Sequence, residues 1–175
     1  MKKENWNESN IPDQSGKIFI VTGPTSGLGK ESVKVLARKN ATVIMAARNI
    51  KKADSVKKEI LAENKNAKID IQELNLSSLE SVNNFSTSIN KKYKVLDCLI
   101  NNAGIMACPY SKTKDGFEIQ MGTNHLGHFA LTGQLISLLK KTPNSRVVNV
   151  SSIAHTSGNI DFDDLNWEKR KYKTW

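Results

Sequence analysis

Apolar and polar positions along this chain follow two alternating periods. Short apolar runs rich in β-branched residues recur five times, as is typical of buried strands: "KIFIVTG", "ATVIMAAR", "KIDIQELNL", "VLDCLINNAG" and "SRVVNVSS". Between them, apolar residues recur three or four positions apart, as at Ile50, Ala53, Val56 and Ile60. That spacing predicts helices with one buried face.

Strands and helices are therefore predicted in strict alternation. The third helical segment opens with a serine cap and carries Glu80 near its first turn. Five strands separated by four helices imply parallel strands joined by right-handed crossovers. The predicted fold class is α/β, a doubly wound parallel sheet (Rossmann-like) in a single domain. The helices are expected at 27–40, 49–64, 77–93 and roughly Gly116 to Lys141.

The two ends of the chain depart from this pattern. Residues 1–16 are polar and are predicted to form an N-terminal extension to a domain spanning residues 17–175. After Ser152, "IAHTSGNIDFDDLNWEKRKYKTW" has neither a strand nor a helix period and is predicted to be an irregular loop.

Residues that could bind a ligand follow each predicted strand. Ligands of doubly wound sheets bind beyond the carboxyl ends of the strands. We therefore expect these groups to meet at one edge of the sheet. They are the turn Gly23–Gly29, Arg48, Asn75, the segment Asn101–Gly104 and the pair Ser151–Ser152.

The first turn, "VTGPTSGLGKES", nearly fits two phosphate-binding motifs. A nucleoside-triphosphate P-loop would need Gly at position 24 and Ser or Thr at position 31, where the chain has Pro24 and Glu31. The fingerprint G-x-G-x-x-G fails as well, because Gly23 is followed by Pro24 and Thr25. The remaining glycines still allow a tight turn before a helix N-terminus, whose free N–H groups bind phosphates.

Four motifs, "TGPTSGLG", "NNAG", "TNHLGHFALT" and "RVVNVSS", occur in this order along the predicted sheet. Together they closely resemble the short-chain dehydrogenase/reductase family, and "NHLGHF" with "NVSSIAH" resembles its retinol-dehydrogenase-like branch. The resemblance runs from about Lys17 to the C-terminus and covers the first part of a family domain. It implies a sheet that is incomplete on its C-terminal side and a nicotinamide dinucleotide as the ligand.

The resemblance also implies which residues contact this cofactor. The glycines would let the backbone approach the pyrophosphate. Asn75, where relatives commonly carry Asp, would lie beside the adenine with Leu76, and the segment after the fourth strand would line the cleft. The alternatives without a cofactor are that the glycines only form a tight βα turn and that the segment after the fourth strand is only a strand end. The implied contacts are Thr22, Gly23, Thr25, Ser26, Gly27, Leu28, Gly29, Asn75, Leu76, Asn102, Ala103 and Gly104.

Arg48 bears on the choice between the two nicotinamide cofactors. An NAD-preferring site places a carboxylate on the adenosine ribose at the end of the second strand, where Ala46 and Ala47 offer none. A guanidinium suits the 2′-phosphate of NADP instead. We expect NADP rather than NAD, with Lys30 either assisting or simply solvated.

The catalytic residues implied by the resemblance are Asn124 and Ser152. Asn124 matches the family asparagine that bends its helix and holds a water in a proton relay. Ser152 matches the serine that hydrogen-bonds the substrate oxygen, with Ser151 as the candidate if the strand register slips.

The family's proton donor is the tyrosine of a Tyr-x-x-x-Lys pair on the helix after the fifth strand. Tyr172 is the nearest candidate, but its lysine would be residue 176 of a chain of 175 residues. We therefore expect a chain truncated before its proton donor, and little or no turnover from the 175-residue form.

Charge and metal-ligating residues narrow the class further. The formal net charge is +9, but the lysines are dispersed over polar helix faces, so we expect no nucleic-acid partner. His125 and His128 stand three apart and make half a metal site at most. No third ligand is nearby, so we favour packing or polar roles and expect no metal.

The cellular setting is predicted from cysteine use and hydropathy. Cys98 and Cys108 are too few for a disulfide framework. The N-terminus has no apolar signal region, and no run is long enough for a membrane span. We expect a cytoplasmic protein, and an unpaired fifth strand would favour a homo-oligomer.

Together these features predict an NADP-dependent oxidoreductase that acts on a carbonyl or alcohol of an apolar small molecule, such as a retinoid, steroid or aldehyde. The alternative is a catalytically inactive nucleotide-binding fragment or gene remnant that lacks the Tyr/Lys pair. A basic RNA-associated domain is the third possibility, and strong retention on heparin would be needed to support it.

Overall fold

A central parallel sheet organises the chain, of which the computed structural model describes residues 6–174. The five strands lie in the order β3-β2-β1-β4-β5, and all neighbouring pairs are parallel. The order reverses at β1, so the predicted doubly wound α/β class is confirmed. The strands are β1 Ile18–Thr22, β2 Thr42–Ala47, β3 Lys68–Glu73, β4 Cys98–Asn101 and β5 Arg146–Asn149.

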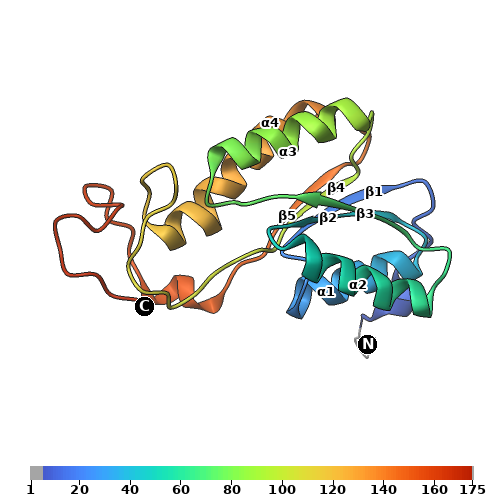
Figure 1. Cartoon of the computed structure of the whole chain (residues 1–175), viewed down its shortest axis with the longest axis horizontal. Coiled ribbons are helices and arrows are strands. Elements are labelled where there is room, and N and C mark those ends of the chain that lie inside the picture. Colours follow the sequence, from blue (N-terminus) through green and yellow to red (C-terminus); the bar gives the residue numbers. More distant parts are fainter. Residues whose placement is uncertain (1–5, 175) are drawn as a thin grey trace, which may run out of the picture.

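Two helices cover each face of the sheet, α1 and α2 on one side and α3 and α4 on the other (Figure 1). The first three helices begin and end close to their predicted positions, which confirms the helical spacing of their apolar residues. The helices are α1 Gly27–Arg38, α2 Ile50–Glu63, α3 Leu79–Lys92 and α4 Gly127–Lys141.

The fourth helix was predicted from Gly116, and this start is wrong. Gly116 has a φ of +87°, a conformation that no residue of a right-handed helix adopts. Beyond it, Glu118 forms an isolated antiparallel bridge with Lys112. The spacing of apolar residues does not reveal such a turn, so the helix was predicted to begin too early.

Glu118 itself starts the helical segment. Its buried carboxylate accepts hydrogen bonds from the backbone N–H groups of Gln120 and Met121, at 2.9 and 2.7 Å. These are N–H groups that a first helical turn leaves without partners. A π-helical segment, η2, then runs over Met121–Leu126 and leads directly into α4. Sequence periodicity missed this segment, because one wide turn does not change which residues are apolar.

Both faces of the sheet are packed, so alternate residues of a strand enter different cores. Ile20 and Ile44 face α3 and α4, whereas Val21 and Val43 face α1 and α2. All four side chains are fully buried. Burial on both faces explains why these strands are continuous apolar runs.

β5 is the exception, because it pairs only with β4 and lies at the edge of the described sheet. All of its residues are exposed, including Val147 and Val148. The segment predicted to be an irregular loop follows, and it contains one short 3-10 helix, η3 Ile153–Ser157.

Residues 161–174 and the loop before η2 lie side by side at one end of the molecule (Figure 1). The Tyr172 ring lies 5.2 Å from that of Tyr110 and 5.4 Å from that of Trp167, centroid to centroid. Arg170 stacks over Trp167 at 4.0 Å and forms an ion pair with Asp161. This aromatic cluster holds the C-terminal segment against the loop.

The N-terminal residues pack on the end of α1. A short 3-10 helix, η1 Glu8–Asn10, carries the carboxylate that accepts two hydrogen bonds from Arg38, at 2.7 and 2.8 Å.

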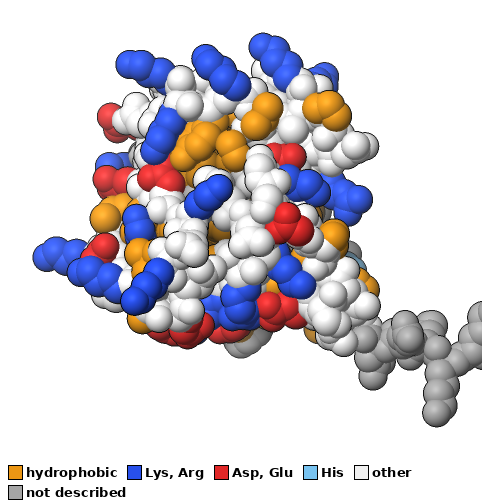
Figure 2. Space-filling model, turned by 90° about the vertical axis from the view of Figure 1, so that its right-hand side faces the viewer, with side chains coloured by type: hydrophobic (Ala, Val, Ile, Leu, Met, Phe, Trp, Pro, Cys, Tyr) orange, Lys and Arg blue, Asp and Glu red, His pale blue; other side chains and the backbone are white. Residues whose placement is uncertain are grey.

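Figure 2 shows the side of the molecule that lies on the right in Figure 1, where Lys and Arg side chains are spread among acidic and polar ones. This is the dispersed pattern that the sequence suggested.

Candidate functional site

Two adjoining clefts open at the carboxyl ends of the strands. The smaller, about 400 Å³, lies beside the turn after β1 and the end of β2. The larger, about 670 Å³, lies beside the ends of β4 and β5 and the η2 segment. Ala103, Gly104 and Ile105 line both clefts and form the wall between them. The polar groups predicted to meet at one sheet edge do so.

The β1–α1 turn is packed so tightly at Gly29 that it leaves no room there for a side chain. A Cβ on Gly29 would lie 2.3 Å from the Gly23 carbonyl oxygen and 2.4 Å from Asn102 Nδ2. Gly27 has a φ of +52° and faces open space. Ser26 precedes the first residue of α1 but makes no side-chain cap hydrogen bond. The turn therefore leaves N–H groups of the helix start unpaired by side chains, as an anion site requires.

The residues predicted for this turn divide into two groups. Gly23, Thr25 and Ser26 line the smaller cleft. Thr22 is fully buried beneath it, and Leu28 is 70% exposed on the outer side. Thr22, Gly27, Leu28 and Gly29 thus shape the turn without lining the cleft.

Two cations line the smaller cleft. Arg48 follows β2, as predicted, and Lys52 follows one helical turn later on α2. Both side chains are exposed, and neither forms an ion pair within residues 6–174. Sequence reasoning missed Lys52, although its spacing of four from Arg48 was a usable signal.

Lys30, the other basic residue considered, is already paired. Its ammonium lies 2.7 Å from Glu59 on α2. Hydrogen bonds from Lys30 and Lys34 hold the pKa of Glu59 down at about 2. Lys30 therefore ties α1 to α2 and does not line either cleft.

The far wall of the smaller cleft carries polar groups with free capacity. Asn75 and Leu76 line it. Asn75 Oδ1 accepts hydrogen bonds from the N–H and hydroxyl of Ser77, which leaves its amide nitrogen available. The Thr123 hydroxyl oxygen, in η2, is buried against this cleft without a hydrogen-bond partner in the described chain. An unpaired buried hydroxyl costs free energy unless a ligand completes it.

The segment after β4 braces the sheet and lines the cleft, the two roles predicted for it. Asn102 Nδ2 donates to the carbonyl oxygens of Thr22 and Gly23, at 2.9 and 3.3 Å. Asn101 Nδ2 donates to Asn149 Oδ1 on β5, at 2.8 Å. Ala103 and Gly104 then border both clefts.

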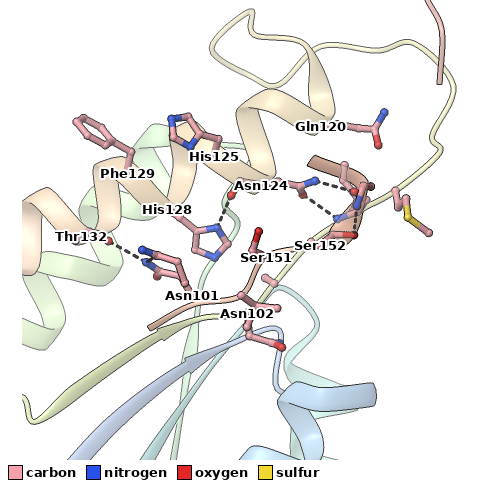
Figure 3. A pocket seen from close by; sticks show the side chains of 17 residues that line it. Asn101, Asn102, Gln120, Asn124, His125, His128, Phe129, Thr132, Ser151 and Ser152 are labelled. Carbon is pink, nitrogen blue, oxygen red and sulfur yellow. Dashed lines mark hydrogen bonds between the residues drawn. The ribbon is translucent and has the colours of Figure 1, made fainter. Parts of the chain in front are cut away.

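Asn124 lies in the π-helical segment and borders the larger cleft (Figure 3). Its amide is fixed by two hydrogen bonds to Ile105: Oδ1 accepts from the N–H at 2.9 Å, and Nδ2 donates to the carbonyl at 2.8 Å. The expected distortion of its helix is present as the π turn. Asn124 is therefore held rigidly at the wall between the clefts.

Ser151 and Ser152 both line the larger cleft, just beyond the end of β5. Ser152 Oγ accepts a hydrogen bond from the N–H of Ala154, at 3.2 Å, and caps η3. In Figure 3, Ser151 projects toward the space between His128 and Asn124. Geometry alone keeps both serines as candidates.

Neither Tyr172 nor Tyr110 lines the larger cleft. The Tyr172 hydroxyl donates to Glu118 Oε1 at 3.0 Å and accepts from Gln120 Nε2 at 2.7 Å. Burial, with a further contribution from Glu118, raises the pKa of Tyr172. Tyr110 and Lys114 have the Tyr-x-x-x-Lys spacing, which sequence reasoning overlooked, but they lie in a loop.

The two histidines of η2 and α4 have separate surroundings. His128 is buried and contacts Thr22 and the Asn124 carbonyl. His125 is exposed, and its ring lies 6.3 Å from that of Phe129. Within residues 6–174, no three His, Cys, Asp or Glu side chains are grouped as metal ligands. The same residues include no helix that is long and apolar enough to cross a membrane.

The fold is that of a doubly wound α/β protein with its clefts at the carboxyl ends of the strands, and comparison with known proteins identifies the family. Residues 17–163 match the short chain dehydrogenase family. The chain belongs to this family, a family of oxidoreductases, as the four motifs predicted.

Curated relatives confirm the resemblance to the retinol-dehydrogenase-like branch. The chain is 47% identical over 159 residues to human Retinol dehydrogenase 13, an alignment that covers 91% of this chain and 48% of the relative. It is 48% identical over 155 residues to mouse Retinol dehydrogenase 12, covering 89% and 49% of the two chains. The chain thus spans about half the length of the curated relatives it matches.

Solved structures agree with the fold. An uncharacterised protein from Mycobacterium paratuberculosis is 44% identical, with a TM-score of 0.82 over 97% of this chain and 59% of that chain. A short chain dehydrogenase from Escherichia coli CFT073, solved in complex with NADPH, is 29% identical, with a TM-score of 0.72 over 89% and 65% of the two chains.

Proposed function

We propose that this chain binds NADP in the smaller cleft and serves in an oxidoreductase that interconverts a carbonyl and an alcohol of an apolar small molecule. The observation that carries the proposal is the smaller cleft itself. A turn with no room for side chains at Gly29 faces two cations, Arg48 and Lys52, that lack acidic partners within residues 6–174. A phosphate-rich dinucleotide meets these requirements.

Each part of the cleft has a role in this proposal. N–H groups at the start of α1 bind the pyrophosphate, and Arg48 and Lys52 bind the phosphate on the adenosine ribose. The Asn75 amide and the Thr123 hydroxyl supply polar contacts to the adenosine part. When bound, the nicotinamide supplies or accepts the hydride. The NADPH complex of the E. coli neighbour supports the same cofactor.

The larger cleft would hold the substrate, and residues that line it would contact and position the substrate. Ser152 would donate a hydrogen bond to the substrate oxygen, and Ser151 is the alternative donor. Asn124, fixed by Ile105, would keep the wall of the cleft in one position. Ile105, Met106 and Phe129 give the cleft an apolar side suited to a retinoid-, steroid- or aldehyde-like molecule.

A second candidate function is nucleotide binding without turnover. It is favoured by the surroundings of Tyr172, whose hydroxyl is engaged by Glu118 and Gln120 outside the larger cleft. Without a positioned acid, the 175-residue form would bind cofactor and leave the substrate unchanged. In this reading residues 17–175 are the cofactor-binding part of a dehydrogenase domain, with residues 1–16 as an extension.

Titration of NADPH and NADH against wild type and Arg48→Asp tests the cofactor. Wild type should prefer NADPH, and Arg48→Asp should lose about tenfold or more in NADPH affinity, since a charge-assisted pair contributes about 1.5 to 3 kcal/mol. Arg146→Asp, at the start of β5, is the matched charge control and should not change the preference. Equal affinities in wild type would refute the NADP assignment.

The catalytic assignment needs a form of the protein that carries a Tyr-x-x-x-Lys helix. In such a form Ser152→Ala should lower kcat much more than cofactor affinity. If Ser151→Ala is damaging and Ser152→Ala is silent, the serines exchange roles.

We also propose a cytoplasmic location and a homo-oligomer that forms through the exposed β5 edge. Cell fractionation tests the location, and light scattering tests the oligomeric state.

A further inference from the structure

His128 is a buried histidine with no role so far in the proposed function. Its side chain lies at the start of α4, and the residue is 6% exposed. Nε2 lies 2.9 Å from the Thr22 hydroxyl oxygen at the end of β1, and Nδ1 lies 2.8 Å from the main-chain oxygen of Asn124. One ring thus joins β1 to the π-helical segment.

The Thr22 hydroxyl determines which ring nitrogen carries the proton. Its oxygen already accepts hydrogen bonds from the N–H groups of Asn102 and Ala103, each at 2.9 Å. A hydroxyl has two lone pairs and one proton, so only its proton is left to give. His128 Nε2 at 2.9 Å is closer than the Ile100 carbonyl oxygen at 3.4 Å, so Nε2 accepts that proton.

The other side of the ring leads to the same result. A main-chain carbonyl oxygen can only accept, so Nδ1 must be the nitrogen that donates to Asn124. A protonated ring would direct a second N–H at an oxygen whose lone pairs are both used. Burial lowers the pKa of His128, as this geometry requires, and the neighbouring His125 lowers it further.

We propose that His128 is a positioning residue: neutral, with its proton on Nδ1, it couples the Thr22 hydroxyl to the Asn124 carbonyl. Thr22 holds Asn102 and Ala103, which border the clefts, while Asn124 holds Ile105. The coupling therefore fixes both ends of the wall between the clefts relative to β1. Its effect on cofactor binding rests on the proposed function, whereas the coupling itself does not.

Nitrogen NMR of the wild-type chain tests the tautomer directly. The protonated and bare ring nitrogens of a neutral histidine resonate far apart, and long-range proton couplings identify each. His128 should show Nδ1–H and a bare Nε2 at neutral pH. The exposed His125, one of three histidines in the chain, is the reference, because its ring makes no hydrogen bond within residues 6–174. A bare Nδ1, or a ring charged at neutral pH, would overturn the proposal.

A mutant cycle tests the coupling. Thr22→Val keeps the shape of the side chain and removes the hydroxyl, and it should shift the amide resonance of Ile105, which binds Asn124. In a His128→Asn background the same change should shift the Ile105 resonance less, because only the route from Thr22 through Asn102 and Ala103 remains. Equal shifts in both backgrounds would refute the coupling.

Cofactor affinity gives the functional readout. Either His128→Asn or Thr22→Val should weaken NADPH binding about 3- to 10-fold, and the double variant should lose little more than one of them. Fully additive losses would count against the proposal. If wild type does not bind NADPH, the NADP proposal fails, and the tautomer and the Ile105 resonance still decide the role of His128. If a variant fails to fold, the wild-type spectrum decides it.

Discussion

β2 and β5 are both short parallel strands that carry valine, but their surroundings are very different. β2 lies between β1 and β3, and nearly every side chain on it is buried. β5 pairs on one side only, and all its residues are exposed. The sheet is thus well covered beside the smaller cleft, whereas the strand that leads to Ser151 and Ser152 is an exposed edge. The same residue type, valine, therefore contributes very different amounts of stability in the two strands, because neighbouring elements determine how much of it is buried.

The largest expected difference between the two sides is catalytic. The 175-residue polypeptide should show turnover about 10²- to 10⁴-fold below a form with a Tyr-x-x-x-Lys helix, because no tyrosine among residues 6–174 lines the larger cleft. NADPH oxidation with retinoid, steroid and aldehyde substrates measures this. Robust turnover from a monodisperse monomer would instead make Tyr172 or another group the proton donor.

The same substitution in the two strands should separate them in stability. Val43→Ala on β2 removes fully buried methyl groups and should cost about 2 to 3 kcal/mol. Val148→Ala on β5, where 43% of the residue is exposed, should cost less than about 1 kcal/mol. Urea unfolding of both variants measures the difference. Similar losses would show that β5 is covered in solution, as a homo-oligomer requires.

Two glycines should respond with opposite signs. Gly29→Ala places a methyl group 2.3 Å from the Gly23 carbonyl oxygen and should destabilise the turn by about 1 to 3 kcal/mol. Gly133→Ala on α4 meets open space and should stabilise its helix by about 0.5 to 1 kcal/mol. Thermal unfolding reports both, and a harmless Gly29→Ala would mean that the turn yields easily to a side chain.

A smaller effect is expected from pH. Burial lowers the folded pKa of His128 below its ordinary value of 6.5. The unfolded chain then binds a proton that the folded chain does not, so the contribution is full above pH 6.5 and is lost as pH falls toward the folded pKa. Stability should fall by at most about 1.4 kcal/mol per pH unit.

Urea unfolding at about pH 7.5 and at about pH 5.5 measures this slope. The window lies above the range in which carboxylates titrate, so histidines dominate it. His128→Asn should flatten the slope. An unchanged slope in the variant would contradict the assignment.

The sequence by itself determined the order of the elements and the chemistry of the strand ends. Continuous apolar runs at 18–22 and 42–47 required strands buried on both faces, and the spacing in 50–63 required a helix with one buried side. Because parallel strands share one carboxyl edge, the residues after them had to meet. The motifs added the family, which local periodicity does not contain.

Only the tertiary structure decided which predicted residues reach a cleft. Thr22 and Gly29 belong to the "TGPTSGLG" motif, but contacts distant in sequence place them under the cleft instead of in it. Lys30 forms an ion pair with Glu59 and does not reach the clefts. Lys52 lines the same cleft as Arg48 because α2 begins at Ile50, directly after the strand end. The π turn at Asn124 and the histidine that holds it depend on contacts with β1. A local pattern records which side chains are apolar, whereas hydrogen bonds between distant elements decide where the polar ones lie.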